Sequence, residues 1–360
     1  MRVLVVGEQL RRAVPGGIGT YVRGLIGGLA KLEHGGPEVT LLASRAPAGP
    51  DPMAAMGPPV VTSHLPARLL TRAWRNGLVR APSGYDLVHA TSFATPRPAL
   101  GAPLAMTVHD LAWRHVPETF PSRGRRWHEA ALAQAMSRAD ALLVGTDDVA
   151  TDLLNAGARA ERVRLIEPMR GCDHLPPGDA AGAALLLGRL GVTGPYLLTV
   201  STIEPRKNLD RLVQAYARAR AELSEPWPLV IVGPNGWGNV TLESVPGAVL
   251  AGPVGSAVLA SLYESARCMV YVPLLEGFGL PAVEAMASGV PVVASPMPST
   301  AGAALEVNPL DVDAIAKGLV VAGCDEDRRA ELISAGLVRT RDLTWERVAR
   351  AHVAVWETLV

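Results

Sequence analysis

The stretch Leu274–Ser295, LLEGFGLPAVEAMASGVPVVAS, has the order of a strand end, a glycine loop, a short helix, a turn and a second strand. The apolar residues Cys268–Leu275 predict a strand buried on both faces of a parallel sheet. Pro281 suits the first turn of a helix and Gly289 its C-terminal cap, which predicts a helix over Pro281–Ser288. Because the first N–H groups of a helix have no intrahelical partner, this helix start predicts a phosphate site.

Two carboxylates flank the predicted phosphate site. Glu276 lies in the glycine loop, and Glu284 interrupts an otherwise apolar face of the helix. Acidic residues are common in the first turns of helices, so one interpretation of Glu284 is a favourable interaction with the helix dipole. The other interpretation is that both carboxylates accept hydrogen bonds from the hydroxyls of a polyhydroxylated ligand. The pattern alone leaves both interpretations open.

This stretch resembles the Glu-x7-Glu motif of retaining GT-B glycosyltransferases of family four. The resemblance is carried by Glu276-Gly-Phe-Gly-Leu-Pro, by Glu284, and by the Ala-Met-Ala-Ser-Gly-Val-Pro-Val-Val-Ala-Ser that follows it. It implies that Glu276 contacts the donor sugar and that Glu284 contacts the nucleotide ribose. It also implies that the donor diphosphate is bound by the loop amides of Gly277, Phe278, Gly279 and Leu280.

The length and composition of the chain set its general class. The 360 residues are enough for two domains, and a formal net charge of zero gives no reason to expect a nucleic-acid partner. Three widely spaced cysteines match neither a disulfide framework nor a metal site. The N-terminus reads as a strand rather than a signal peptide, and no apolar run approaches the ~20 residues that span a bilayer. We therefore expect a cytoplasmic protein with no metal and no cofactor, and the near replacement of lysine by arginine suggests a bacterial source.

Alternating strand and helix patterns predict an α/β protein with parallel sheets. The Pro- and Gly-rich segment Pro176–Pro195 predicts a domain boundary. We expect one Rossmann-like domain over residues 1–180 and another over residues 190–343. The resemblance implies a GT-B fold, in which an N-terminal acceptor domain and a C-terminal nucleotide-sugar donor domain face a cleft. It also implies that a last helix, residues 344–360, crosses back to the N-terminal domain.

A glycine segment, Pro15–Tyr21, separates the first predicted strand from a helix expected over Tyr21–Lys31. Its spacing does not match the G-x-G-x-x-G dinucleotide fingerprint, which argues against a Rossmann oxidoreductase. A simple glycine turn is one interpretation of the segment. The resemblance implies instead that Gly16 and Gly17 lie opposite the donor diphosphate.

His109 directly follows a strand predicted over Leu104–Val108, at a carboxyl end where open α/β sheets bind ligands. A histidine there is either a structural residue of the strand end or a donor to a sugar hydroxyl or a developing charge. The residues Val108–Leu111, together with Pro117 and Glu118, resemble the donor-site loop of the same family. The resemblance therefore implies a functional role for His109.

Arg206 and Lys207 follow a strand predicted over Tyr196–Val200. At a junction between a loop and a helix, two cations can clamp phosphates, although adjacent basic residues are also common on surfaces. The sequence Glu204-Pro-Arg-Lys-Asn-Leu resembles the diphosphate motif of the family, which implies that these cations stabilise the leaving group without a metal. The resemblance also places Asn235 near the base.

The sequence departs from the family pattern at two places. Ser201 stands where the family usually has glycine. After Ser295, a turn that commonly contains Pro-Glu-Val is several residues short, so that residues 296–302 run straight into Ala303. These departures keep open the alternative of a protein that binds a nucleotide sugar without turning it over.

A basic amphipathic stretch follows Pro66. Such a helix can rest on anionic lipid, which would make the protein peripheral on the inner face of the membrane. The alternative is a solvated face with a tryptophan packed into the domain. A second basic cluster, from Arg123 to His128, has two interpretations, contact with an anionic acceptor or a solvated loop, and the solvated loop is preferred. The amphipathic stretch places Arg68, Arg72, Arg75 and Arg80 beside Leu69, Leu70, Trp74 and Leu78.

We therefore predict transfer of a hexose from a nucleotide-diphosphate sugar to a hydroxyl of a glycan, a lipid-linked acceptor or a small molecule, with retention of configuration. Glu276 is expected to orient the sugar rather than attack it. The alternatives are an idle nucleotide-sugar-binding protein and a Rossmann oxidoreductase. The oligomeric state is not predicted. The predicted catalytic residues are His109, Arg206, Lys207 and Glu276.

Overall fold

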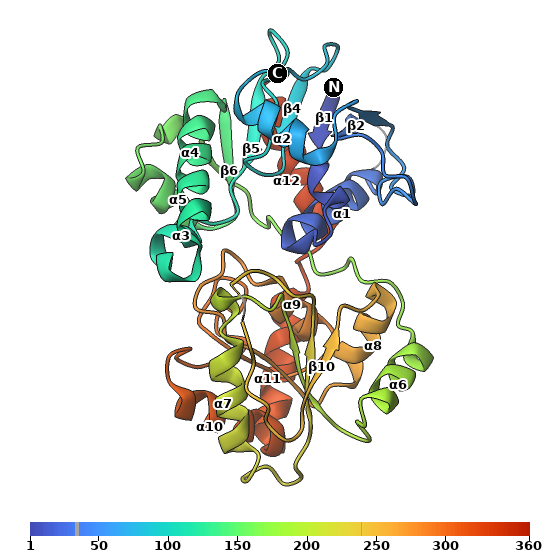
Figure 1. The fold of residues 1–360 in the computed structure, drawn as a ribbon, viewed down its shortest axis with the longest axis vertical. Helices are drawn as coiled ribbons and strands as arrows, with labels where there is room; N and C mark the ends of the chain where they lie inside the picture. Colours follow the sequence, from blue (N-terminus) through green and yellow to red (C-terminus); the bar gives the residue numbers. More distant parts are fainter. Residues whose placement is uncertain (33–35, 239) are drawn as a thin grey trace. The chain divides into compact units, whose positions relative to one another are not determined.

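The computed structural model describes residues 1–32, 36–238 and 240–360. These residues form two compact α/β units, each built on a parallel sheet (Figure 1). The fold class predicted from the sequence is therefore confirmed. No helix among the described residues is long and apolar enough to cross a membrane. The first unit comprises Met1–Leu111, Ser122–His174 and Thr344–Val360, and the second comprises Ala112–Pro121 and Leu175–Leu343.

The sheet of the first unit has the strand order β3-β2-β1-β4-β5-β6-β7. The order reverses between β1 and β4, which is where open α/β sheets bind ligands. The strands are β1 (Arg2–Val6), β2 (Glu38–Ala43), β3 (Val60–Thr62), β4 (Leu87–Ala90), β5 (Leu104–Thr107), β6 (Ala141–Val144) and β7 (Val163–Leu165). The helices are η1 (Glu8–Arg11), α1 (Gly16–Ala30), α2 (Ala67–Arg75), α4 (Ser122–Arg138), α5 (Asp147–Asn155), η3 (Ala160–Arg162) and α12 (Trp345–Glu357).

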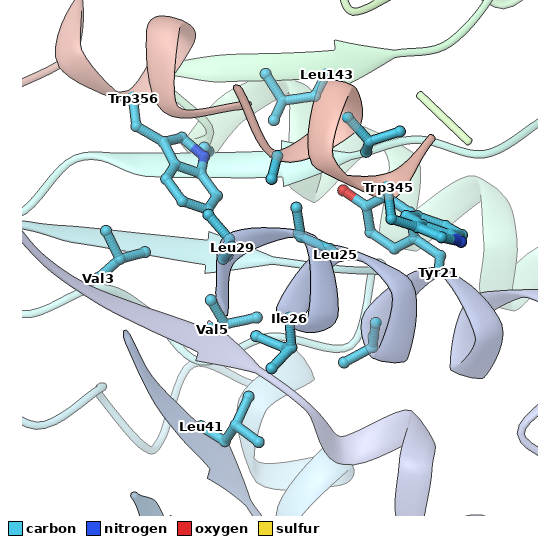
Figure 2. Close-up of a cluster of buried hydrophobic side chains, with 14 of the residues drawn as sticks. Val3, Val5, Tyr21, Leu25, Ile26, Leu29, Leu41, Leu143, Trp345 and Trp356 are labelled. Carbon is cyan, nitrogen blue, oxygen red and sulfur yellow. The ribbon is translucent and has the colours of Figure 1, made fainter. Parts of the chain in front are cut away.

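The core of the first unit joins the sheet, α1 and the C-terminal helix α12 (Figure 2). Two glycines of α1 allow this packing. A Cβ on Gly24 would lie 2.0 Å from Cε2 of Trp345, and a Cβ on Gly28 would lie 2.0 Å from the carbonyl oxygen of Trp345. Larger residues at these positions would push α12 away from α1. The C-terminal helix therefore packs within the first unit, as predicted.

The sheet of the second unit has the strand order β10-β9-β8-β11-β12-β13, which reverses between β8 and β11. Its strands are β8 (Leu197–Val200), β9 (Leu229–Val232), β10 (Ala248–Gly252), β11 (Cys268–Tyr271), β12 (Val292–Ala294) and β13 (Leu305–Glu306). Its helices are α3 (Ala112–His115), η2 (Pro117–Thr119), α6 (Ala180–Arg189), η4 (Pro205–Lys207), α7 (Leu209–Ala219), α8 (Ser256–Ser265), α9 (Leu280–Ala287), α10 (Val312–Cys324) and α11 (Glu326–Thr340).

Two apolar clusters cover the two faces of the second sheet. Leu197 belongs to one cluster and its neighbour Leu198 to the other, and Cys268 and Met269 divide in the same way. Successive side chains of a strand point to opposite faces, so a strand buried on both faces must be apolar throughout. This is why the predicted strands of this unit read as continuous apolar runs.

Three local predictions differ from the structure. The glycine segment predicted as a loop before Tyr21 is the first turn of α1, which begins at Gly16. The segment Pro176–Pro195, predicted as a linker, contains α6, because Asp179 caps a helix there by accepting from the N–H of Gly182 at 2.8 Å. The basic residues from Arg123 to His128 lie in α4 rather than in a loop.

Candidate functional site

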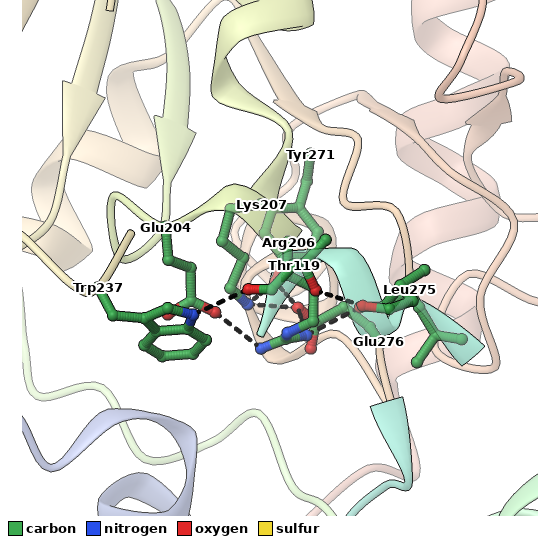
Figure 3. Close-up of polar contacts among 9 residues, drawn as sticks. Thr119, Glu204, Arg206, Lys207, Trp237, Tyr271, Leu275 and Glu276 are labelled. Atoms are coloured by element: carbon green, nitrogen blue, oxygen red, sulfur yellow. Dashed lines mark hydrogen bonds and ion pairs between the residues drawn. The ribbon is translucent and has the colours of Figure 1, made fainter. Parts of the chain in front are cut away.

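The carboxyl ends of β8 and β11 are neighbours at the point where the second sheet reverses its strand order. The chain leaves β8 toward η4, which carries Arg206 and Lys207, and leaves β11 toward the loop that carries Glu276. Ligands of open α/β sheets bind in this position. Figure 3 shows the two cationic side chains converging on the Glu276 carboxylate.

One oxygen of Glu276 is the centre of this cluster. Nη1 of Arg206 donates to Oε1 of Glu276 at 2.7 Å and to the carbonyl oxygen of Leu275 at 2.8 Å. The ammonium of Lys207 contacts the same Oε1, and the hydroxyl of Tyr271 donates to it at 2.9 Å. Glu204 holds the other side of the guanidinium, where its Oε1 lies 3.1 Å from Nη2 of Arg206. The sequence predicted the two cations and Glu276 but missed Tyr271 and Glu204 as partners.

The charges of the cluster depend on one another. Burial alone would raise the pKa of Glu276, but the positive charges of Arg206 and Lys207 hold that pKa at about 2. Burial lowers the pKa of Lys207, an effect that the Glu276 charge opposes. Burial and the same carboxylate raise the pKa of Tyr271 well above its usual range. Glu276 is thus an anion and Tyr271 a neutral hydroxyl at neutral pH.

The loop between Glu276 and α9 requires glycine at its last position. Gly279 caps α9 with a φ of +93°, a left-handed conformation that glycine adopts without strain. A Cβ at this position would also lie 2.3 Å from Sδ of Met297 and 2.9 Å from Oγ of Ser299. Tight packing under Gly279 fixes the loop whose amides, from Gly277 to Leu280, are predicted to bind a diphosphate.

The turn after Ser295, residues 296–302, is held by two sets of hydrogen bonds. The hydroxyl of Thr300 donates to Oε1 of Glu306 at 2.7 Å. Arg339 of α11 donates to the carbonyl oxygens of Pro298 and Ser299 at 3.2 and 3.1 Å. The turn that packs against Gly279 through Met297 and Ser299 is therefore held in place by side chains on both sides.

Glu284 has an internal partner that the sequence did not reveal. The hydroxyl of Tyr263 on α8 donates to Oε2 of Glu284 at 2.8 Å, and both side chains are buried. Burial, with the neighbouring Glu284 charge, raises the pKa of Tyr263 well above its usual range. Tyr263 therefore stays protonated and fixes the orientation of the carboxylate.

The loop that contains Asn235 is joined to the loop after β8. Asn235 pairs with Ile203 in a short parallel bridge, and the N–H of Gly236 donates to the carbonyl oxygen of Ile203 at 2.9 Å. Nε1 of Trp237 donates to the carbonyl oxygen of Thr119 at 3.1 Å (Figure 3). No sequence signal predicted this last contact, which joins residues far apart in the chain.

The predicted residues of the first unit lie in two different surroundings. Nε2 of His109 lies 2.8 Å from the carbonyl oxygen of Thr91, and its Nδ1 lies 2.6 Å from Nη2 of Arg170. The carbonyl can only accept, so Nε2 carries the proton and Nδ1 accepts from the guanidinium. Burial, followed by Arg170, lowers the pKa of His109 well below its usual range, which keeps the ring neutral. Gly16 and Gly17, in contrast, are exposed at the start of α1.

Within the described residues, no group of histidine, cysteine, aspartate or glutamate side chains has an arrangement that could hold a metal ion.

Ser201 also lies near the site. Its hydroxyl is buried without a hydrogen-bond partner in the described part of the chain. Its carbonyl oxygen would lie 2.0 Å from a Cβ on Gly233, so the close approach of these two loops requires glycine at 233.

Comparisons with known proteins cover both units. Residues 15–169 match the family described as Glycosyltransferase Family 4, and residues 194–333 match the family described as Glycosyl transferases group 1. The O-antigen chain mannosyltransferase B of Escherichia coli is 30% identical over 265 residues, which cover 70% of each chain. The D-inositol 3-phosphate glycosyltransferase of Mycobacterium avium is 30% identical over 323 residues, which cover 81% of this chain and 72% of the relative.

Solved structures show the same fold. Anabaena HepE, in complex with UDP and glucose, matches with a TM-score of 0.73 at 17% identity and full coverage of both chains. Sucrose-phosphate synthase of Thermosynechococcus elongatus matches with a TM-score of 0.75 at 20% identity, over 100% of this chain and 99% of the other. At these identities the similarity concerns the fold.

Proposed function

The chain belongs to glycosyltransferase family 4, and from this premise we propose that it transfers a hexose from a nucleotide-diphosphate sugar to a hydroxyl, with retention of configuration at the anomeric carbon. The names of its relatives describe a mannosyltransferase and an inositol-phosphate glycosyltransferase, and HepE has been solved with UDP-glucose. Because the chain belongs to this family, we do not propose the alternative of a Rossmann oxidoreductase.

The observation that carries the proposal is the ion cluster beside the start of α9. Arg206 and Lys207 present two positive charges, and the N-terminal amides of the adjacent helix add a third source of positive potential. A diphosphate carries negative charge over several oxygens and fits this arrangement. When the sugar leaves, charge develops on the same phosphate, so these groups stabilise the transition state without a metal ion.

Glu276 occupies the place that the diphosphate would take. The Oε1 of Glu276 accepts from Arg206 and Tyr271 and contacts Lys207, so one anion pairs with both cations, and Glu204 adds a second negative charge at Arg206. We assign these cations to the diphosphate when the donor binds. The displaced carboxylate then turns to the hydroxyls of the sugar, beside the carbon that becomes electron-poor.

The chemical step is assigned to the front face of the sugar. The bond between the anomeric carbon and the phosphate oxygen breaks through an oxocarbenium-like state, and the electron pair stays with the phosphate. The acceptor oxygen forms its bond from the same face, and its proton passes to the departing phosphate oxygen. The carboxylate of Glu276 orients the sugar and favours the positive charge of this state. Tyr263 holds Glu284, which we assign to the ribose hydroxyls.

A thermal-shift series tests the proposal. UDP, GDP, ADP and their hexose conjugates are added with and without EDTA, because a ligand that binds the native state raises the unfolding temperature. We expect stabilisation by one nucleotide, unchanged by EDTA. Stabilisation by none, or its loss with EDTA, contradicts the metal-independent donor site.

Two further readouts test catalysis. Slow hydrolysis of the matched donor, followed by proton NMR, should first release the sugar with the anomeric configuration of the donor. The opposite anomer contradicts retention. Binding of a donor that is neither hydrolysed nor transferred to any acceptor identifies the idle nucleotide-sugar-binding protein instead.

A further inference from the structure

The region between Pro52 and His109 is unusually poor in negative charge. It contains one carboxylate, Asp86, and five arginines. Asp86 is already engaged, since its Oδ2 accepts from the backbone N–H of Arg2 at 2.7 Å and its Oδ1 from the Arg2 side chain at 3.4 Å. The positive charge of this region is therefore not neutralised from within its own sequence.

The fold gathers these arginines on one surface of the first unit. Arg80 and Arg97 pair in a short parallel bridge, which joins the chain after α2 to the chain after β4. The guanidinium of Arg97 lies so close to Gly77 that a Cβ there would be 2.6 Å from its Nε. From α4, Gln134 donates to the carbonyl oxygen of Arg75 at 3.0 Å. The end of α2, the two loops and α4 are thus adjacent.

Helix α4 adds one more cation to this surface. Burial lowers the pKa of Arg138, and the positive charge of Arg97 lowers it further, so the two guanidinium groups repel each other. Six arginines of this surface have no ion pair with a carboxylate anywhere in the described residues, and they are Arg68, Arg72, Arg75, Arg80, Arg97 and Arg138. Crowded cations without counter-charges are favourable where an anionic partner covers them.

Apolar side chains stand among these cations. Leu78 is 76% exposed and Leu100 is 89% exposed, and Leu69 on the outer face of α2 is 55% exposed. The inner face of α2 is already anchored, because Leu70 and Trp74 are each 1% exposed. The three exposed leucines are therefore additional to the side chains that hold α2 in place. Figure 1 shows the position of α2 in the first unit.

We propose that this surface, the arginine-leucine face, docks onto an anionic lipid bilayer. The arginine-leucine face comprises the six arginines named above with Leu69, Leu78 and Leu100. Guanidinium groups pair with lipid phosphates, while the leucines enter the boundary between headgroups and acyl chains. A nucleic acid would satisfy the cations but would leave the leucines in water. This inference goes beyond the glycosyl transfer proposed above and does not depend on it.

Co-sedimentation with vesicles tests the proposal. We expect the protein to bind vesicles of phosphatidylcholine with phosphatidylglycerol and not vesicles of phosphatidylcholine alone. The variant R68E/R72E/R75E should bind at least ~100-fold more weakly, since each basic residue near an anionic bilayer contributes about a fivefold factor. The matched control R159E/R189E/R341E changes the net charge equally at exposed arginines elsewhere and should bind as the parent does. The variant L78S/L100S should bind more weakly without any change of charge.

Any of four results would overturn the proposal, and three of them come from the vesicle experiment. The parent protein fails to bind the anionic vesicles, the control variant loses binding as completely as R68E/R72E/R75E, or L78S/L100S binds as well as the parent. Equal binding to a DNA duplex, insensitive to the leucine change, identifies a nucleic-acid surface instead and also contradicts it. Each variant is checked for an unchanged unfolding temperature, so that lost binding is not lost folding.

Discussion

The hydroxyl of Tyr21 on the first helix lies 2.7 Å from Nε2 of His352 on the last helix. Nδ1 of His352 is 2.7 Å from the carbonyl oxygen of Val348 and must donate to it, so Nε2 accepts from Tyr21. The hydroxyl of Thr107 lies 2.9 Å from both Tyr21 and Nε2 of His89. The hydrogen bonds therefore run in one direction, from His89 through Thr107 and Tyr21 to His352. This buried chain attaches the C-terminal helix to the sheet.

Replacing Tyr21 by phenylalanine removes the central hydroxyl of this chain. Two buried partners, Thr107 and His352, then lose a hydrogen bond, and we expect a loss of about 1–3 kcal/mol in the free energy of unfolding. Thermal and urea unfolding measure the effect. Tyr196→Phe is the control, because its buried hydroxyl donates to a backbone carbonyl, that of Leu262 at 2.7 Å, and does not link the first unit's sheet to α12. A Tyr21 variant no less stable than the control would contradict the structural role of the chain.

The same series of hydrogen bonds, from His89 to His352, predicts that the protein loses stability in acid. Burial lowers the pKa of His352 to about 4, whereas a histidine in the unfolded chain has a pKa of about 6.5. Below about pH 6.5 the unfolded chain therefore binds a proton that the folded chain does not. The free energy of unfolding therefore keeps this contribution in full above about pH 6.5. It decreases toward pH 4, by up to ~1.4 kcal/mol per pH unit. Burial lowers the pKa of His89 in the same direction.

The variant His352→Phe separates the contribution of one histidine. It should be less stable than the parent at neutral pH, because Tyr21 loses its acceptor. Its unfolding temperature should then fall less steeply as the pH is lowered. Parallel curves for the two proteins would show that His352 does not carry this pH dependence.

Two glycines of α1 make a matched pair for testing the contact with α12. Alanine at Gly24 would place a Cβ 2.0 Å from the ring of Trp345, and we expect the overpacking to cost about 1–3 kcal/mol. Alanine at Gly27, in the same helix, meets no atom within 4 Å. It should stabilise the protein by about 0.5–1 kcal/mol through helix propensity. Urea unfolding compares them, and equal effects would show that α12 does not press on α1.

Local rules predicted those elements whose determinants are local. The strand predicted over Tyr196–Val200 and the helix after Gly279 agree closely with the structure, because an apolar run and a glycine cap act within a few residues. The helix over Ala180–Arg189 was not predicted, because the flanking prolines indicate a linker more strongly than the Asp179 cap indicates a helix. The start of α1 was misplaced because Gly16 and Gly17, poor helix formers by propensity, lie in its first turn.

The partners inside the candidate site could not be predicted in the same way. Arg206 and Glu276 were each predicted by motif, but their 2.7 Å contact joins two loops that only the β8–β11 pairing brings together. Tyr271 and Tyr263 lie in a strand and a helix whose sequences give no hint that their hydroxyls reach carboxylates. Polar contacts between distant segments depend on tertiary structure and leave no periodic signal.

Arg206 and Lys207 should be needed for binding of a nucleoside diphosphate. Losing one charge-assisted contact to phosphate is expected to cost about 1.5–3 kcal/mol, so each alanine variant should bind ~10–100-fold more weakly. Calorimetry with the diphosphate selected by thermal shift measures this. Arg211→Ala is the control, since that side chain donates to Asn208 at 2.8 Å rather than to the Glu276 cluster. An unchanged affinity of the double variant R206A/K207A for the nucleoside diphosphate would show that the phosphate site lies elsewhere.

The last prediction separates the two glutamates. Glu276 pairs with both cations and would compete with a diphosphate for them, and its pKa of about 2 means that it does so as an anion. The variant Glu276→Gln should therefore bind the bare nucleoside diphosphate as tightly as the parent or more tightly. Its turnover should fall by ~10²–10³, because the charge beside the oxocarbenium-like state is lost.

Glu284→Gln should show the opposite pattern. If Glu284 binds the ribose, the variant should bind both the bare diphosphate and the sugar donor ~10–100-fold more weakly. Its turnover should be less affected. The exposed Glu222→Gln is the control for both measurements. Weaker diphosphate binding by the Glu276 variant, with normal binding by the Glu284 variant, would reverse the orientation of the donor. Insensitivity of binding and turnover in both variants would leave the carboxylates with a structural role, in which Glu276 only pairs with Arg206 and Lys207.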